Sequence, residues 1–129
     1  MRGTTTSNLG KKLTVTGKTR ESVIMFLSNV LERKFSDAEK ELENIKEKKF
    51  PDEEYQQGYI NALEGLLLSV RSGDERDFYN RTLANGKSMD EYIKEFKEFR
   101  KLPVRTQFDQ GYFSAWTDML QFRINSERS

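Results

Sequence analysis

Apolar residues recur at helical spacing along most of the chain after its first 19 residues. The first predicted helix spans about residues 20–34, and its apolar residues share one face: Val23, Phe26, Leu27, Val30 and Leu31. A second helix is predicted from Ser36, whose hydroxyl can form a capping box with Glu39, and it should end before Pro51. Its apolar stripe is narrow, so we expect most of this helix to be solvated.

A third helix is predicted between Asp52, a suitable N-cap, and Gly73, a suitable left-handed residue at the C-terminal end. A short fourth helix follows over about residues 74–85. A fifth begins with the capping box Ser88 and Glu91 and ends before Pro103, and a sixth spans about residues 106–124. The pattern therefore predicts an all-α fold of about six helices.

One motif occurs twice, as aromatic-x-Gln-Gly-Tyr-x-x-Ala at 55–62 and again at 108–115. Gly111 follows Gly58 by 53 positions, and Pro103 follows Pro51 by 52. We interpret this near-constant spacing as an internal duplication. A single domain, residues 20–129, should then contain two pseudo-equivalent three-helix units at about 20–72 and 73–125.

Glycine within a helix costs about 1 kcal/mol relative to alanine, so its recurrence at equivalent positions needs a structural reason. Gly58 with Ala62, and Gly111 with Ala115, each place two small residues one turn apart. We expect the third and sixth helices to cross there in close contact. A weaker alternative is a small-molecule pocket at the pseudo-symmetry axis, framed by the polar residues of both motifs: Gln57, Tyr59, Gln110 and Tyr112.

Charge changes the interpretation of the N-terminus. The chain has a net charge of +1, yet its first 20 residues contain five basic residues and no acidic one. We expect residues 1–19 to form a flexible, basic, Thr-rich arm. An alternative function follows, in which the protein associates with nucleic acid through contacts of the arm with phosphates: Lys11, Lys12, Lys18 and Arg20.

The composition excludes several kinds of catalytic and metal-binding site. The chain has no Cys and no His, which excludes disulfides, thiolate or imidazole metal sites and the commonest general base. Glu95 and Glu98 supply only half of a helical Mg²⁺ signature. We therefore predict no enzyme, no metal and no cofactor. No apolar run approaches the roughly 18 residues that span a bilayer, and no apolar leader precedes the helices, so we expect a cytoplasmic protein without membrane association.

Aromatic residues are concentrated in the second half of the chain. They widen the stripe of the sixth helix beyond the needs of one core, unless that helix is buried on most sides. The leading hypothesis is a non-enzymatic interaction module: an adaptor, accessory subunit or regulator that binds a protein partner or a second copy of itself. Its binding surface would be apolar and rich in aromatic residues: Phe96, Phe99, Phe113, Trp116, Leu120 and Phe122.

Overall fold

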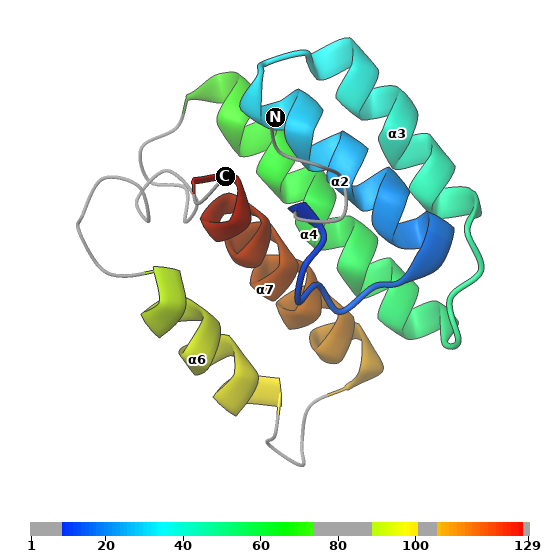
Figure 1. Ribbon diagram of the computed structural model, residues 1–129. Helices are drawn as coiled ribbons and strands as arrows, with labels where there is room; N and C mark the ends of the chain where they lie inside the picture. The colour runs from blue at the N-terminus through cyan, green and yellow to red at the C-terminus, as the bar shows by residue number, and fades with distance from the viewer. Residues whose placement is uncertain (1–8, 74–88, 101–105, 128–129) are drawn as a thin grey trace.

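A computed structural model describes residues 9–73, 89–100 and 106–127 (Figure 1). These ranges contain five helices and no strand: α2 (Gly17–Leu31), α3 (Phe35–Glu47), α4 (Glu53–Ser72), α6 (Met89–Arg100) and α7 (Gln107–Glu127). The all-α prediction is confirmed. The predicted helix at 74–85 and the capping residue Ser88 lie outside the described residues.

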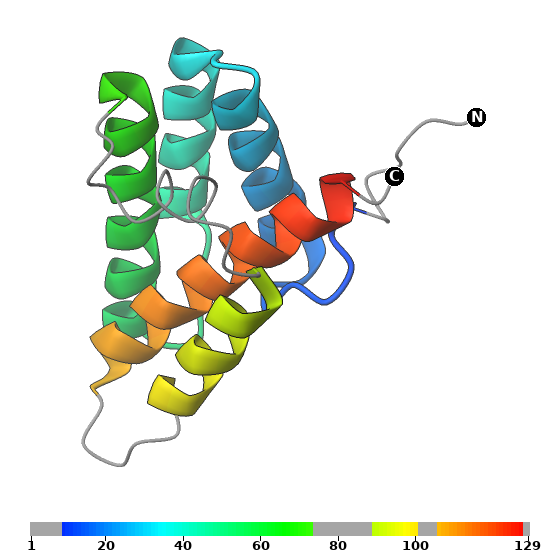
Figure 2. The ribbon, with the colours of Figure 1, turned by 90° about the vertical axis from the view of Figure 1, so that its left-hand side faces the viewer.

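The helices form two layers. α2, α3 and α4 lie side by side and run alternately up and down, while α7 crosses them obliquely with α6 beside it (Figures 1 and 2). The contact between α4 and α7 is the most extensive in the described part of the chain, and α6 packs on α7. α7 therefore lies between α6 and the three-helix layer.

The two motif glycines lie where α4 meets α7. A Cβ built on Gly58 would overlap the backbone carbonyl of Phe108, and one built on Gly111 would overlap the carbonyl of Tyr55. The contact is reciprocal, because each glycine faces the carbonyl three residues before the other. The hydrogen that stands in place of each Cβ points at a carbonyl oxygen, a weak contact that recurs at helix interfaces.

Both ends of α4 follow from its sequence. The Asp52 side chain accepts a hydrogen bond of 2.8 Å from the backbone N–H of Tyr55, and Gly73 ends the helix with φ of 69°. Both predictions are confirmed. The capping box predicted for α3 is wrong: the helix begins at Phe35, after Lys34, without a side-chain cap. Ser36 is the second residue of the helix, so its hydroxyl is past the position from which it could cap.

α7 is buried on nearly all sides from Ser114 to Asn125. A helix with apolar residues on every face belongs in a core. The expected aromatic docking surface is therefore wrong for Trp116, Leu120 and Phe122, each at most 6% exposed, and Phe113 is half-buried. α6 covers one side of α7, which explains the wide stripe. The side chains of Phe96 and Phe99 lie outside the described residues.

The expected flexible arm is corrected for residues 9–19. α2 begins at Gly17, and the preceding segment packs against the helices, with Leu13 at 5% and Val15 at 8% exposure. The Asn125 side chain donates hydrogen bonds to the carbonyls of Leu9 (2.9 Å) and Lys11 (2.8 Å). The alternating apolar residues Leu13 and Val15 hold the segment to the core, so only residues 1–8 lie outside the described structure there.

The glycine contact predicts a specific loss of stability. Replacement of Gly58 or Gly111 by alanine should lower the free energy of unfolding by about 1–3 kcal/mol, because the new methyl group forces two helix backbones apart. Denaturant titration of each variant measures the change.

Gly65 supplies the matched control, since it is exposed on the same helix and nothing lies within 4 Å of a Cβ built on it. Gly65→Ala should raise stability by up to about 1 kcal/mol through helix propensity alone. Equal gains at Gly58, Gly111 and Gly65 would show that the backbones do not meet at the crossing.

Candidate functional site

The crossing of α4 and α7 does not form the pocket considered from the sequence. Backbone atoms fill it at both glycines, and Tyr59 is fully buried beneath it. Gln57 is exposed and lines a surface hollow instead, while Gln110 and Tyr112 are half-buried. Phe108 is the only residue of the second motif to line that hollow among the described residues. The two glutamines therefore do not frame a common cavity.

A buried polar cluster lies next to the crossing. The Asp118 carboxylate on α7 is completely buried and accepts hydrogen bonds from the Tyr59 hydroxyl (2.6 Å), the Thr14 hydroxyl (2.6 Å) and the Thr14 backbone N–H (2.7 Å). Buried carboxylates require such partners, since desolvation of a charge is costly. The cluster therefore joins α4, α7 and the N-terminal segment.

Sequence reasoning missed the role of Asp118. A usable signal was present, because Asp118 is the only charged residue between Asp109 and Arg123 in a largely apolar helix. An isolated charge in such a stretch indicates a buried polar contact.

Burial and charge act together on Tyr59. Its pKa is raised well above the ordinary value of 10.0, first because burial disfavours the phenolate and next because the Asp118 carboxylate repels a second negative charge. The hydroxyl therefore stays protonated and donates to Asp118. The Tyr59–Asp118 hydrogen bond thus keeps its proton on the tyrosine hydroxyl.

The four basic residues considered for phosphate contacts differ in their exposure and contacts. Arg20 is half-buried, and its guanidinium donates to the carbonyls of Val15 (2.8 Å) and Leu13 (3.4 Å). Lys11, Lys12 and Lys18 are exposed. Arg20 thus fixes the N-terminal segment to α2, and only the three lysines of this set remain on the surface.

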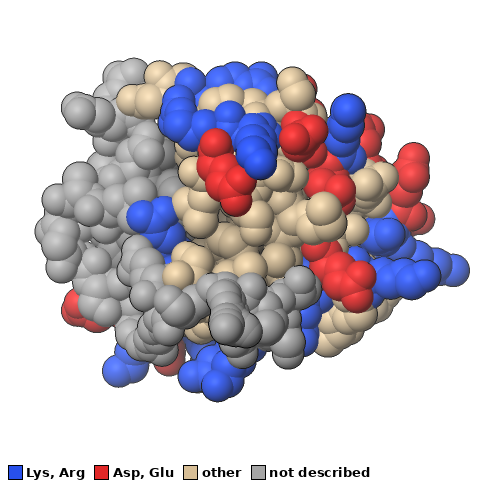
Figure 3. All heavy atoms as spheres, turned by 45° about the horizontal axis from the view of Figure 1, so that its top comes forward, with Lys and Arg blue, Asp and Glu red and all other residues tan. Residues whose placement is uncertain are grey.

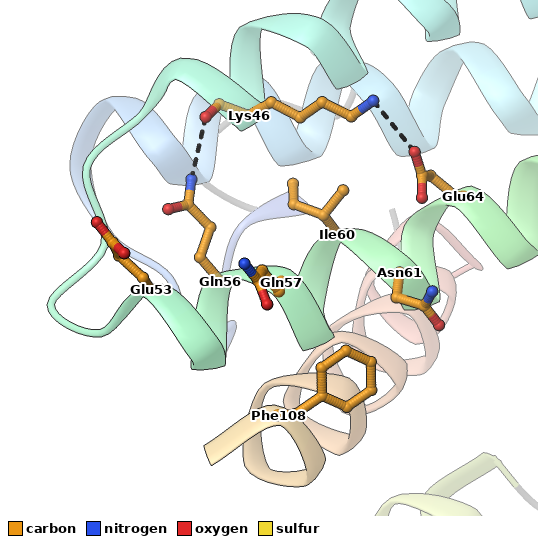
Figure 4. A pocket seen from close by; sticks show the side chains of 8 residues that line it. All are labelled: Lys46, Glu53, Gln56, Gln57, Ile60, Asn61, Glu64 and Phe108. Atoms are coloured by element: carbon orange, nitrogen blue, oxygen red, sulfur yellow. Dashed lines mark hydrogen bonds and ion pairs between the residues drawn. The ribbon is translucent and has the colours of Figure 1, made fainter.

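An elongated depression follows the outer face of α4 beside α3 in the described part of the chain. Its upper hollow, of about 460 Å³, is lined by Glu39, Leu42, Glu43, Lys46, Glu64, Leu67, Leu68 and Arg71. Its lower hollow, of about 510 Å³, is lined by Lys46, Glu53, Gln56, Gln57, Ile60, Asn61, Glu64 and Phe108 (Figure 4). We call the two together the α3–α4 trough, because they share Lys46 and Glu64.

The trough exists because α3 packs more closely on α2 than on α4. The narrow apolar stripe of α3 leaves Glu39 and Glu43 facing the gap, and carboxylates do not close it. At the lower end, the Gln56 amide donates to the carbonyls of Lys48 (2.7 Å), Ile45 and Lys46 (both 3.3 Å), which satisfies the C-terminus of α3. The sequence pointed to Gln57, whereas its neighbour Gln56 makes this link.

Ion pairs cross the trough at two levels. Lys46 binds Glu64 on α4 at 3.1 Å (Figure 4). It also binds Glu43 on its own helix at 3.0 Å. Hydrogen bonds to Glu43 and then to Glu64 raise the pKa of Lys46 above its usual value. Arg71 on α4 binds Glu39 on α3 at 2.7 Å. These pairs are exposed, so each adds little stability.

Leu68 stands at the rim of the upper hollow. It is 67% exposed, and Met25 on α2, at 54%, is the other large apolar side chain exposed in the described residues. Leu68 continues an apolar strip whose inner members, Leu42 and Leu67, are nearly buried at 5% and 6%. Met25 lines neither hollow of the trough.

The described residues contain no group of three or more acidic, His or Cys side chains placed to hold a metal ion. Within the same residues, no helix has the length and apolar character needed to cross a bilayer.

The buried cluster predicts a pH-dependent loss of stability. Tyr59→Phe should lower the free energy of unfolding by about 1–3 kcal/mol at neutral pH, because Asp118 loses a buried donor. Above about pH 10 the unfolded tyrosine ionises while the folded one keeps its proton, so the wild type should lose up to about 1.4 kcal/mol per pH unit from this group. The variant lacks that slope, and the two stabilities should converge.

Tyr112→Phe, at the matching position of the second motif, is the control and should change stability little at either pH. Denaturant titrations at pH 7 and pH 11 measure all three proteins. Parallel pH slopes for wild type and Tyr59→Phe would contradict the proposed ionisation linkage.

Comparisons of the chain with protein-family models, with curated proteins and with solved structures find no match.

Proposed function

We propose that this protein is a non-enzymatic interaction module whose α3–α4 trough binds one helical segment of a protein partner. The observation that carries the proposal is the exposure of Leu68, 67%, at the rim of a concave surface with an apolar floor. A single exposed leucine is ordinary on a protein surface. A leucine beside a long depression matches the way in which an amphipathic helix inserts its apolar face into a groove.

The dimensions of the trough support a helical occupant. Its lining residues on α4 extend from Glu53 to Arg71, about 27 Å at the helical rise of about 1.5 Å per residue. A parallel helix of about 18 residues has the same length. The two hollows, of about 460 and 510 Å³, share Lys46 and Glu64 and together offer space for several side chains of one helix.

Fixed geometry on the inner face of α4 also favours binding. Gly58 contacts the backbone of α7, and Tyr59 bonds to Asp118, so α4 is anchored along the side opposite its exposed residues. A surface that is already in its binding geometry loses less conformational entropy on association. The proposal therefore moves the docking surface from the aromatic residues of α7 to the outer faces of α3 and α4.

Nucleic-acid association is the less favoured function. The Arg20 guanidinium donates hydrogen bonds to backbone carbonyls of its own chain. On the face shown in Figure 3, basic and acidic side chains are interspersed rather than separated into one basic surface. Phosphate binding depends on neutralisation by clustered cations, and three exposed lysines at 11, 12 and 18 supply little of that.

We also propose that the chain is organised as two related three-helix units. The reciprocal contacts of Gly58 with Phe108 and of Gly111 with Tyr55 support this proposal, because equivalent residues of the two motifs exchange roles across a local twofold axis. The unit boundary near residue 73 coincides with the end of α4.

Leu68→Asp tests the function. A carboxylate at the rim should abolish capture of the trough partner from native extract while the protein stays folded, since the side chain is mostly exposed. Affinity capture with quantitative mass spectrometry compares the wild type with the variant.

Met25→Asp is the matched control, an equal change of an exposed apolar residue on α2, and it should retain the same captured proteins. Loss of a protein with Leu68→Asp and not with Met25→Asp supports the trough. Identical capture by the wild type and both variants would overturn it.

A further inference from the structure

Acidic side chains predominate along the α3–α4 trough. Four carboxylates line it, and only two cations, Lys46 and Arg71, accompany them. The carboxylates lie on both helices and at both ends: Glu39, Glu43, Glu53 and Glu64. The trough therefore carries a formal charge of about −2 at neutral pH from these residues.

Both cations are already held by the trough's own carboxylates. Lys46 is shared between Glu43 (3.0 Å) and Glu64 (3.1 Å), and Arg71 binds Glu39 at 2.7 Å. Arg71 also lies over the ring of Phe35, with 5.5 Å from its guanidinium carbon to the ring centroid. Part of the charge of each cation is therefore already balanced within the trough.

The carboxylates in these pairs are more exposed than the cations. The side chains of Glu39 and Glu64 are 54% and 46% exposed, against 43% for Arg71 and 38% for Lys46, so an approaching cation reaches them more readily. An incoming carboxylate would face the net negative charge of the trough, and like charges across an interface oppose association.

We propose that the helical segment bound by the α3–α4 trough is a basic amphipathic helix, whose aliphatic side chains contact Leu68, Leu67 and Ile60 while its flanking Lys or Arg residues pair with the trough carboxylates. This inference rests on the proposed function. The aliphatic contacts supply affinity, because Leu68 becomes buried only in the complex. The flanking charges set the class of partner and speed the encounter.

The arrangement explains the form of the lower hollow as well. Ile60 points toward the Lys46 stem from the floor, with Glu53 at one end and Glu64 at the other (Figure 4). An aliphatic side chain of the partner fits over Ile60, and cations one or two helical turns away on either side lie near the two carboxylates. Phe108 of α7 adds an apolar wall to this end.

Two synthetic helices of about 18 residues test the charge class. Both carry leucines at helical spacing on one face, and they differ only in flanking residues, lysine in one and glutamate in the other. The isotope-labelled full chain is titrated with each peptide, and backbone amide shifts are followed by NMR. We expect the lysine peptide to shift amides of α3 and α4 around the trough, with weaker binding at high salt, and the glutamate peptide to shift none.

Three variants locate the binding. Leu68→Ser should weaken the lysine peptide about tenfold, as for a central apolar contact. Glu39→Gln combined with Glu64→Gln should weaken it about fivefold and reduce the salt dependence. Met25→Ser should leave the affinity unchanged.

Four other outcomes would contradict the inference. Binding of the glutamate peptide at the trough, dependent on Leu68, would keep the trough as a docking site and refute the basic partner. Shifts by the lysine peptide that spread over the whole surface and do not depend on Leu68 would indicate nonspecific electrostatic binding and would refute the inference. Absence of binding by either peptide would refute it as well. If the free protein dimerises and Leu68→Ser makes it monomeric, the occupant is a second copy of the chain. The capture experiment with Leu68→Asp tests the proposed function separately from the charge class of the partner.

Discussion

The contact of Gly58 and Gly111 with opposing backbone carbonyls is the constraint on which the rest of the fold depends. It lets the backbones of α4 and α7 meet directly, and any side chain at either glycine would separate them. This separation sets the position of Tyr59 relative to Asp118, whose hydrogen bond of 2.6 Å tolerates little displacement. It also packs the inner face of α4 against α7, so that the trough lies on the outer face of α4.

Asp118 then extends this anchoring to the N-terminal segment. A buried carboxylate without donors would destabilise the fold, yet here Tyr59 and Thr14 supply three hydrogen bonds to it. Because the partners come from positions far apart in the chain, the cluster can form only when α4, α7 and the segment before α2 are all in place. The cluster favours one arrangement of these elements over others that would leave Asp118 unsatisfied.

Much of the local structure could be predicted from the sequence. The glycine pairs indicated a close helix crossing at the place where the structure has one, and Asp52 and Gly73 marked the ends of α4 correctly. The caps could be predicted because they act within one turn of helix. The crossing joins distant residues, and it could be predicted because glycine within a helix is costly and its recurrence needs a close neighbour.

The errors concern contacts between distant residues. Periodicity could not show whether Trp116 and Phe122 face solvent or a second layer, because that depends on where α6 packs. The polar sequence before α2 suggested a mobile arm, whereas Thr14 finds its partner 104 residues away at Asp118. The trough was not predicted for the same reason, because its lining comes from α3, α4 and α7 and depends on how these helices pack.

The central claim is that the outer faces of α3 and α4 receive a partner. The chain has no cysteine, so a single cysteine can place a photo-activated crosslinker at one position in native extract. Asn61→Cys places it in the trough, and Met25→Cys places it on α2. The account predicts a discrete crosslinked product from Asn61→Cys that is missing from Met25→Cys. The same products from both positions, or one from Met25→Cys alone, would contradict it.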